Sequence, residues 1–113
     1  MEQRYSIAIV GCGPAGLSAA LNAKIRNKSI LLVGDNGISS KVSRAGLVKN
    51  YLGFPSVSGD ELREAFLTHI TQMGITITDT HIDGIYSMGN YFVLCSQGKV
   101  YEAKTVILAV GSK

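Results

Sequence analysis

The sequence has few of the residues that mark redox-disulfide and metal-binding proteins. It contains only two cysteines, Cys12 and Cys95, which lie far apart and do not form a Cys-x-x-Cys pair. Its two histidines, His69 and His81, do not combine with them at the spacing of a metal site. We therefore expect neither a redox disulfide within the chain nor a zinc centre.

Long apolar runs and concentrated charge are also missing. No uninterrupted apolar stretch approaches the roughly 18 residues that a membrane helix needs. The 11 basic residues are scattered and the net charge is +3, whereas nucleic-acid binding requires a concentrated basic face. The opening residues, Met1 to Arg4, lead directly into a strand-like segment rather than a secretory signal. We expect a cytoplasmic protein that binds neither membranes nor nucleic acid.

The pattern that is present is that of one α/β domain over residues 1–113. A helix is predicted from Pro14 to about Asn27, and a second begins at the capping box of Ser58 and Glu61 and ends at Gly74. Four short apolar segments predict a buried parallel sheet, namely residues 5–10, 29–33, 75–78 and 105–110.

The connections complete a three-layer prediction. Residues 34–57 are rich in Gly, Ser and Asn, and they predict a long loop with room for one short helical turn. Turns at residues 87–90 and 97–98 predict a small β-meander on the face of the sheet opposite the helices. Together these elements predict a Rossmann-like, dinucleotide-binding fold.

The main functional signal is a Gly-x-Gly-x-x-Gly stretch between the first strand and the first helix. Gly11 permits a tight turn, Gly13 has no side chain to block a phosphate, and Gly16 allows close packing of the helix. Pro14 and Ala15 open the helix, whose free N–H groups attract a pyrophosphate. We interpret the stretch as a dinucleotide cradle; a purely structural glycine-rich turn is the alternative.

Two residues near the cradle have two interpretations each. The second strand is followed by Gly34, and Asp35 comes one place later than the acid that binds a ribose hydroxyl in such sites. Asp35 either binds the ribose or serves as a turn residue, so these residues alone do not decide between FAD and NAD. Cys12 is interpreted as a small filler of the turn; a reactive thiol at the helix N-terminus is the alternative.

Three separated stretches resemble the thioredoxin reductases and related flavoproteins of the pyridine nucleotide-disulfide oxidoreductase family. They read Gly-Cys-Gly-Pro-Ala-Gly-Leu at residues 11–17, Lys-Asn-Tyr-Leu-Gly-Phe-Pro at 49–55 and Ser-Gly-Asp-Glu-Leu at 58–62. The closing Val-Ile-Leu-Ala-Val-Gly at 106–111 is similar to the family's strand ending in Ala-Thr-Gly. The resemblance implies FAD at this cradle, in the first part of an FAD domain that the family completes with a C-terminal segment.

The resemblance also implies roles for individual residues. Asn50 matches an asparagine that lies along the flavin and its ribityl chain, and Gly34 matches a glycine after the second strand. His81 and Ile82 match a pair that meets the adenine end through backbone groups. The closing motif is matched by Ala109 and Gly111. The sequence departs from the family at residues 38–42, which read Ile-Ser-Ser-Lys-Val instead of Gly-Gly-Gln-Leu, and at Val110, which replaces a threonine.

Two classes of function follow. In the first, the chain is the FAD-binding portion of an oxidoreductase in which hydride passes from NAD(P)H to the flavin and then to a disulfide or another acceptor. No catalytic residue is expected in this stretch, so the chain alone is not expected to be active. In the second, the chain is a non-catalytic dinucleotide-binding or interaction module. An open apolar surface near residues 105–111 further predicts a homodimer.

Overall fold

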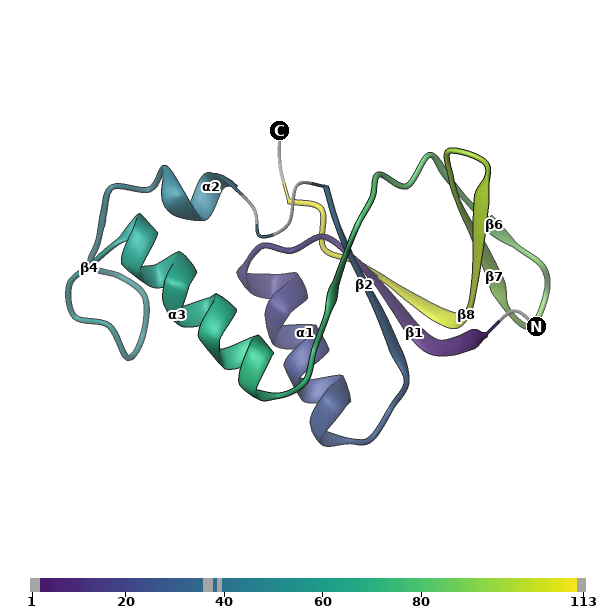
Figure 1. Ribbon diagram of the computed structural model, residues 1–113, viewed down its shortest axis with the longest axis horizontal. Coiled ribbons are helices and arrows are strands. Elements are labelled where there is room, and N and C mark those ends of the chain that lie inside the picture. Colours follow the sequence, from purple (N-terminus) through teal and green to yellow (C-terminus); the bar gives the residue numbers. More distant parts are fainter. Residues whose placement is uncertain (1–2, 36–37, 39, 112–113) are drawn as a thin grey trace.

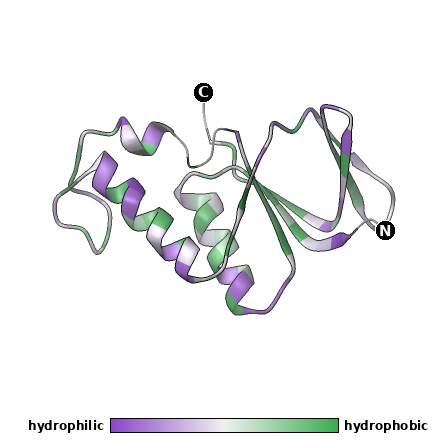
Figure 2. Ribbon diagram, in the orientation of Figure 1, coloured by the Kyte–Doolittle hydropathy of each residue, from purple (hydrophilic) through white to green (hydrophobic). Residues whose placement is uncertain are grey.

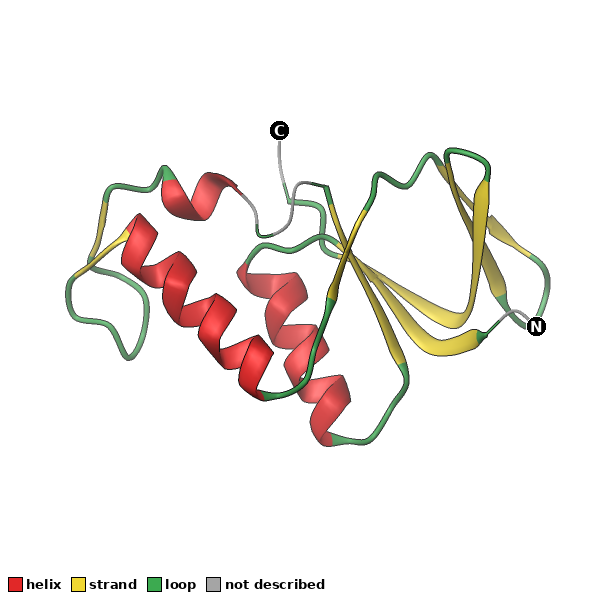
Figure 3. Ribbon diagram, viewed as in Figure 1, coloured by secondary structure: helices red, strands yellow, loops and turns green. Residues whose placement is uncertain are grey.

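The computed structural model describes residues 3–35, 38 and 40–111, and a six-stranded mixed sheet runs through them. The sheet has the order β5-β2-β1-β8-β7-β6. Its parallel part consists of β1 (Arg4–Val10), β2 (Ile30–Gly34), β5 (Ile77–Asp79) and the second half of β8 (Lys99–Leu108). These strands confirm the predicted parallel sheet and the α/β class (Figures 1 and 3).

Two helices lie together on one face of the sheet, α1 (Pro14–Ile25) and α3 (Gly59–Gln72) (Figure 1). Their buried side chains form one core with Ile9 of β1 and Leu32 of β2. Figure 2 shows α1 as hydrophobic over most of its length, whereas α3 alternates between hydrophobic and hydrophilic residues. The central strands lie between these helices on one face and the meander on the other. Because both of their faces are covered, they consist of short apolar runs.

The predicted meander is present on the opposite face. It consists of β6 (Gly84–Ser87), β7 (Phe92–Ser96) and the first half of β8. Leu94 of β7 is completely buried and packs against a second core that contains Ala8, Val33 and Ala103. This core confirms the third layer of the prediction.

The last predicted strand had the wrong start and end. Instead of a separate strand over residues 105–110, β8 is one ten-residue strand, Lys99–Leu108. Its first half pairs antiparallel with β7 and most of its length pairs parallel with β1. The strand leaves its partner β7 after Ala103 and continues beside β1. Its hydrophobic pattern therefore changes from polar alternation to an apolar run, while the backbone continues unbroken.

Several other predicted boundaries also shift. The first helix ends at Ile25 rather than near Asn27, which takes a left-handed conformation with φ of 58°. The second strand begins at Ile30 instead of residue 29. The strand predicted at residues 75–78 is β5 at Ile77–Asp79, because Ile75 instead donates its N–H to Ile70 and caps the end of α3.

The predicted long loop contains short elements. Its one helical turn is confirmed as α2 (Ser40–Ser43), and the two-residue strands β3 (Leu47–Val48) and β4 (Val57–Ser58) pair antiparallel. The last pair was missed because two residues are too few to show a period. Ser39, which belongs to the stretch that departs from the family, lies outside the described residues.

The capping box at the start of α3 is confirmed. The Glu61 N–H donates to Ser58 Oγ at 3.0 Å, and the Ser58 N–H donates to Glu61 Oε1 at 3.0 Å. These bonds to the Ser58 backbone and side chain lower the pKa of Glu61 below its ordinary value. Among the described residues, the helices are all too short or too polar to cross a membrane.

Candidate functional site

The glycine turn connects the end of β1 with the start of α1 and packs against Ala109, which follows β8. Gly11 has φ of 123°, and a Cβ there would lie 2.0 Å from the carbonyl oxygen of Ala109. A Cβ on Gly16 would lie 1.9 Å from the carbonyl oxygen of Gly11 and 3.5 Å from the Ala109 Cβ. Real Cβ atoms essentially never approach within 3.0 Å, so glycine is required at both positions. These contacts place the first turn of α1 directly against the ends of the two central strands.

The N-terminus of α1 is left without the usual caps. Its N-cap residue, Gly13, has no side chain to accept a hydrogen bond, and its first turn contains no acidic residue. By contrast, α3 has a full capping box and acidic residues at Asp60 and Glu61. An uncapped helix start offers N–H groups and the positive end of the helix dipole to an anion. The arrangement fits a pyrophosphate, which would supply the missing acceptors.

A pocket of about 190 Å³ opens at this helix start. It brings together five of the predicted site residues with four that sequence reasoning did not select. The predicted residues are Gly11, Gly13, Pro14, Ala109 and Gly111, and the others are Cys12, Val110 and the α2 residues Lys41 and Val42. Lys41 and Val42 belong to the stretch that departs from the family, so the resemblance left contacts to the cofactor in doubt there and the two residues were not selected. The remaining cradle residues also lie here, Ala15 exposed in the first helical turn and Gly16 buried beneath it.

Cys12 is part of the packing rather than a reactive group. It is 4% exposed and belongs to the core under the helices. Burial raises the pKa of its thiol to about 11. Because the nucleophile in cysteine chemistry is the thiolate, a thiol that stays protonated at neutral pH is inert. The structure thus favours the small-filler interpretation over the reactive one.

A second group of predicted residues meets at the carboxyl ends of β2 and β5. Gly34, the buried last residue of β2, pairs with Asp79 at the end of β5. Asp35 follows in an exposed turn, and its Oδ2 lies 3.3 Å from His81 Nδ1. Ile82 is half-buried against the core beneath the meander. Ligands of open α/β sheets bind outside the carboxyl ends of the strands, so this position suits the adenosine end of a dinucleotide.

Asn50 lies apart from both groups. It is exposed and lines a separate, open pocket of about 430 Å³ formed by its own loop, residues 49–55. At the tip of this loop, the Phe54 N–H donates to the Tyr51 carbonyl at 2.9 Å and Gly53 has φ of 95°. This turn exposes Leu52 almost completely, at 98%. The described residues therefore do not connect Asn50 with the cradle pocket.

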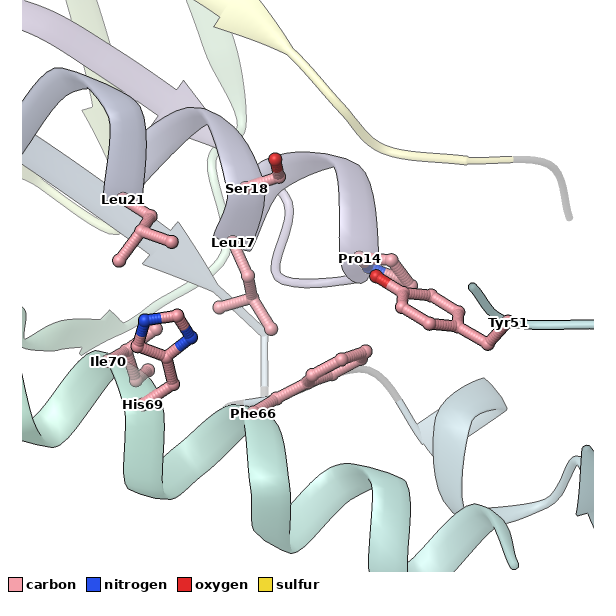
Figure 4. A pocket seen from close by; sticks show the side chains of 8 residues that line it. All are labelled: Pro14, Leu17, Ser18, Leu21, Tyr51, Phe66, His69 and Ile70. Atoms are coloured by element: carbon pink, nitrogen blue, oxygen red, sulfur yellow. The ribbon is translucent and has the colours of Figure 1, made fainter. Parts of the chain in front are cut away.

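An apolar groove runs between α1 and α3, and Figure 4 shows its side chains. Tyr51 reaches from the loop toward Pro14 and packs at a tilt against Phe66 of α3, with 5.5 Å between ring centroids and 56° between ring planes. His69 lies on its rim and is exposed, as expected of a surface histidine. The groove holds about 130 Å³ and is lined mainly by apolar side chains. Through Tyr51, the loop of residues 49–55 contacts both helices.

Metal binding finds no support among the described residues. No group of three or more His, Cys, Asp or Glu side chains lies close enough to hold a metal ion within those residues. Both cysteines are free thiols. What the cradle offers is the uncapped start of α1, whose N–H groups can donate to an anion.

Comparison with known proteins gives one consistent result. Residues 5–113 match the model of the pyridine nucleotide-disulphide oxidoreductase family. The chain is 30% identical to the thioredoxin reductase of Bacillus subtilis, over 99% of its own length and 35% of that protein. It is 50% identical to a ferredoxin-flavin thioredoxin reductase from Clostridium acetobutylicum, with a TM-score of 0.95 over 98% of this chain and 39% of the other. The thioredoxin reductase of Streptococcus pyogenes has 29% identity and a TM-score of 0.92, over the whole of this chain and 37% of the other. The chain spans about a third of the length of the curated relatives it matches.

Proposed function

The chain belongs to the pyridine nucleotide-disulphide oxidoreductase family, and from this premise we propose that it forms the FAD-binding part of a thioredoxin reductase-like oxidoreductase. The observation that carries the proposal is the uncapped start of α1, which lies in a pocket with Gly11, Gly13 and Ala109. In this site an FAD pyrophosphate would accept hydrogen bonds from the first-turn N–H groups of Ala15 and Gly16.

The other predicted residues take positions along the same ligand. Gly34, Asp35 and the segment of His81 and Ile82 would hold the adenosine at the ends of β2 and β5. Ala109 and Gly111 would close the pyrophosphate pocket from β8, and Asn50 would follow the flavin from its loop. When bound, the flavin accepts and passes on electrons, and this chain binds and orients it.

The electron donor of the whole protein has two candidates. The family description supports NAD(P)H, which would reduce the flavin by hydride transfer. Ferredoxin is the second candidate, because two structures that are 50% and 46% identical to this chain are described as ferredoxin-flavin thioredoxin reductases. Anaerobic bleaching of flavin absorbance in the full-length gene product tests them. Bleaching by NADPH or NADH alone supports the first, and bleaching only by reduced ferredoxin supports the second.

The alternative function is a dinucleotide-binding module without redox activity. The full-length gene product distinguishes the two, because an FAD-binding oxidoreductase shows a visible flavin absorbance band and a module for other adenine nucleotides does not. We also propose that the protein is cytoplasmic, since its two free cysteines suit a reducing compartment.

We propose that the isolated chain forms a homodimer through β8. On the side away from β1, β7 pairs with β8 only over Lys99–Ala103, so the last residues of the strand form an unpaired edge within the described sheet. Leu108 and Val110 are 65% and 69% exposed there. An apolar, unpaired edge favours pairing with a second copy. A sedimentation experiment that finds only monomer at high concentration would count against this assembly.

The substitution Gly13→Val tests the cradle itself. Gly13 has φ of −84° and ψ of −172°, an extended conformation that valine adopts readily, so the fold should persist. Its branched side chain would lie where the phosphate must approach, and FAD binding should be lost. Ser87→Val, on exposed β6, is the control. If Gly13→Val binds FAD as tightly as the parent chain in calorimetric titration, the proposed function is wrong.

A further inference from the structure

His81 reaches Asp35 across two neighbouring strands. Asp35 follows β2 and His81 follows β5, and these strands run parallel with Gly34 opposite Asp79. Both side chains are 63% exposed, and 3.3 Å separates His81 Nδ1 from Asp35 Oδ2. This contact is an ion pair when His81 is protonated, and it involves one oxygen of the carboxylate. The second oxygen, Oδ1, is a further hydrogen-bond acceptor.

The two residues differ in how firmly the chain holds them. The segment around His81 is fixed on both sides, because the Thr80 hydroxyl bonds to the buried Ser96 hydroxyl and Asp83 accepts a hydrogen bond from the Gln97 N–H at 2.9 Å. Asp35, by contrast, belongs to an exposed turn. The contact with His81 therefore restricts the rotation of the Asp35 carboxylate.

We propose that His81 is a positioning residue for the adenosine ribose. Its Nδ1–H holds Asp35 Oδ2, and the free Oδ1 accepts a hydrogen bond from a ribose hydroxyl of the bound nucleotide. The proposal rests on the proposed function, since it assumes that the adenosine of FAD lies at this edge of the sheet. It also makes the site selective for an adenosine with free hydroxyls, because a phosphate on the ribose would meet the Asp35 carboxylate.

Calorimetric titration of this chain and its variants with FAD, ADP and 2′,3′-dideoxy-ADP tests the role of His81. His81→Ala should weaken FAD and ADP binding about two- to fivefold, in keeping with the small energy of exposed charge-assisted contacts. His81→Asn should restore binding to within about twofold, because its amide nitrogen takes the place of Nδ1. His81→Gln is the matched control, since its amide lies one bond farther out and should not restore binding.

Asp35→Asn should weaken binding by a similar factor, and combination with His81→Ala should add little, as expected of residues that act as one unit. None of these substitutions should change the affinity for 2′,3′-dideoxy-ADP, which lacks both hydroxyls. Unchanged FAD affinity in His81→Ala, or an equal loss toward the dideoxy nucleotide, would overturn the positioning role. Gly13→Val reports separately on the proposed function, which stands if that variant loses FAD while His81→Ala does not.

Discussion

The substitution Gly16→Ala has two opposing effects on the free energy of unfolding, a gain in helix propensity and a clash with the backbone. Gly16 lies in the first turn of α1, where alanine is favoured over glycine by about 1 kcal/mol on helix propensity alone. Against this, the new Cβ would lie 1.9 Å from the Gly11 carbonyl oxygen and 2.8 Å from its carbon. These atoms belong to the backbone of the glycine turn, so the contact cannot be relieved by rotating a side chain.

The clash should prevail. Separating the two backbones by the further 1 Å or so that a Cβ needs resembles overpacking of a core, which costs typically 1–3 kcal/mol and occasionally more. A backbone contact of 1.9 Å calls for the upper part of that range, about 2–3 kcal/mol. After subtraction of about 1 kcal/mol for helix propensity, we expect a net loss of about 1–2 kcal/mol. For a domain of this size such a loss lowers the melting temperature by very roughly 4–8 °C.

Thermal melts followed by circular dichroism measure this effect. Ser18→Ala is the matched control, because Ser18 is exposed on the same helix and its replacement should give only the small gain in propensity. FAD affinity should fall in Gly16→Ala and remain unchanged in the control, since the N–H groups of the cradle move only in the former. A Gly16→Ala variant that melts at or above the parent temperature would refute the close approach of α1 to the glycine turn.

Three further outcomes are expected. Ser58→Ala removes the cap of α3 and should cost about 1 kcal/mol in urea unfolding. Ser87→Ala, at the exposed end of β6, removes only a long 3.4 Å bond from the Gly89 N–H and should cost less; equal effects would contradict the capping role. Burial raises the pKa of Cys12 to about 11 in the folded chain, so the unfolded chain loses this proton first and stability should fall as the pH rises above about 9. A Cys12→Ala variant should therefore show a shallower fall in melting temperature between pH 8 and pH 10. The isolated chain has no Cys-x-x-Cys pair, so it should give no turnover when it is supplied with FAD, NADPH and a thioredoxin-like disulfide and NADPH absorbance is followed. Robust turnover would mean that the chain contains a redox site of its own.

The elements that sequence reasoning placed well have local physical causes. The turn and helix at Gly11 to Gly16 follow from glycine and proline geometry, and α3 follows from the reciprocal bonds of Ser58 and Glu61. Each of these signals lies within a few residues and is decided by the backbone conformation that those residues allow. The parallel strands were predicted for a similar reason. Burial on both faces leaves short runs of apolar residues, which can be recognised in the sequence without knowledge of the partner strands.

The features that were missed depend on contacts between distant segments. Lys41 reaches the cradle pocket only because α2 lies near the end of β8, and its sequence neighbours give no sign of this. The continuous course of β8 was missed because its pattern follows its partners, β7 first and β1 later, rather than its own backbone. The pairing of Asp35 with His81 likewise depends on which strands are neighbours in the sheet.

Exposed apolar residues lie directly beside the cradle. Val110 lines the cradle pocket and is also 69% exposed, so the wall that would face a bound nucleotide continues directly into an uncovered apolar edge at Leu108. In the proposed site, the pyrophosphate would meet Gly11, Gly13 and the first turn of α1, all of which belong to this chain. Among the described residues, the one proposed contact to the flavin is Asn50, which lies on a separate exposed loop. Since each polar contact that is missing costs on the order of 1 kcal/mol, tight binding of the flavin ring should depend on a segment that covers β8, while recognition of the phosphates should not.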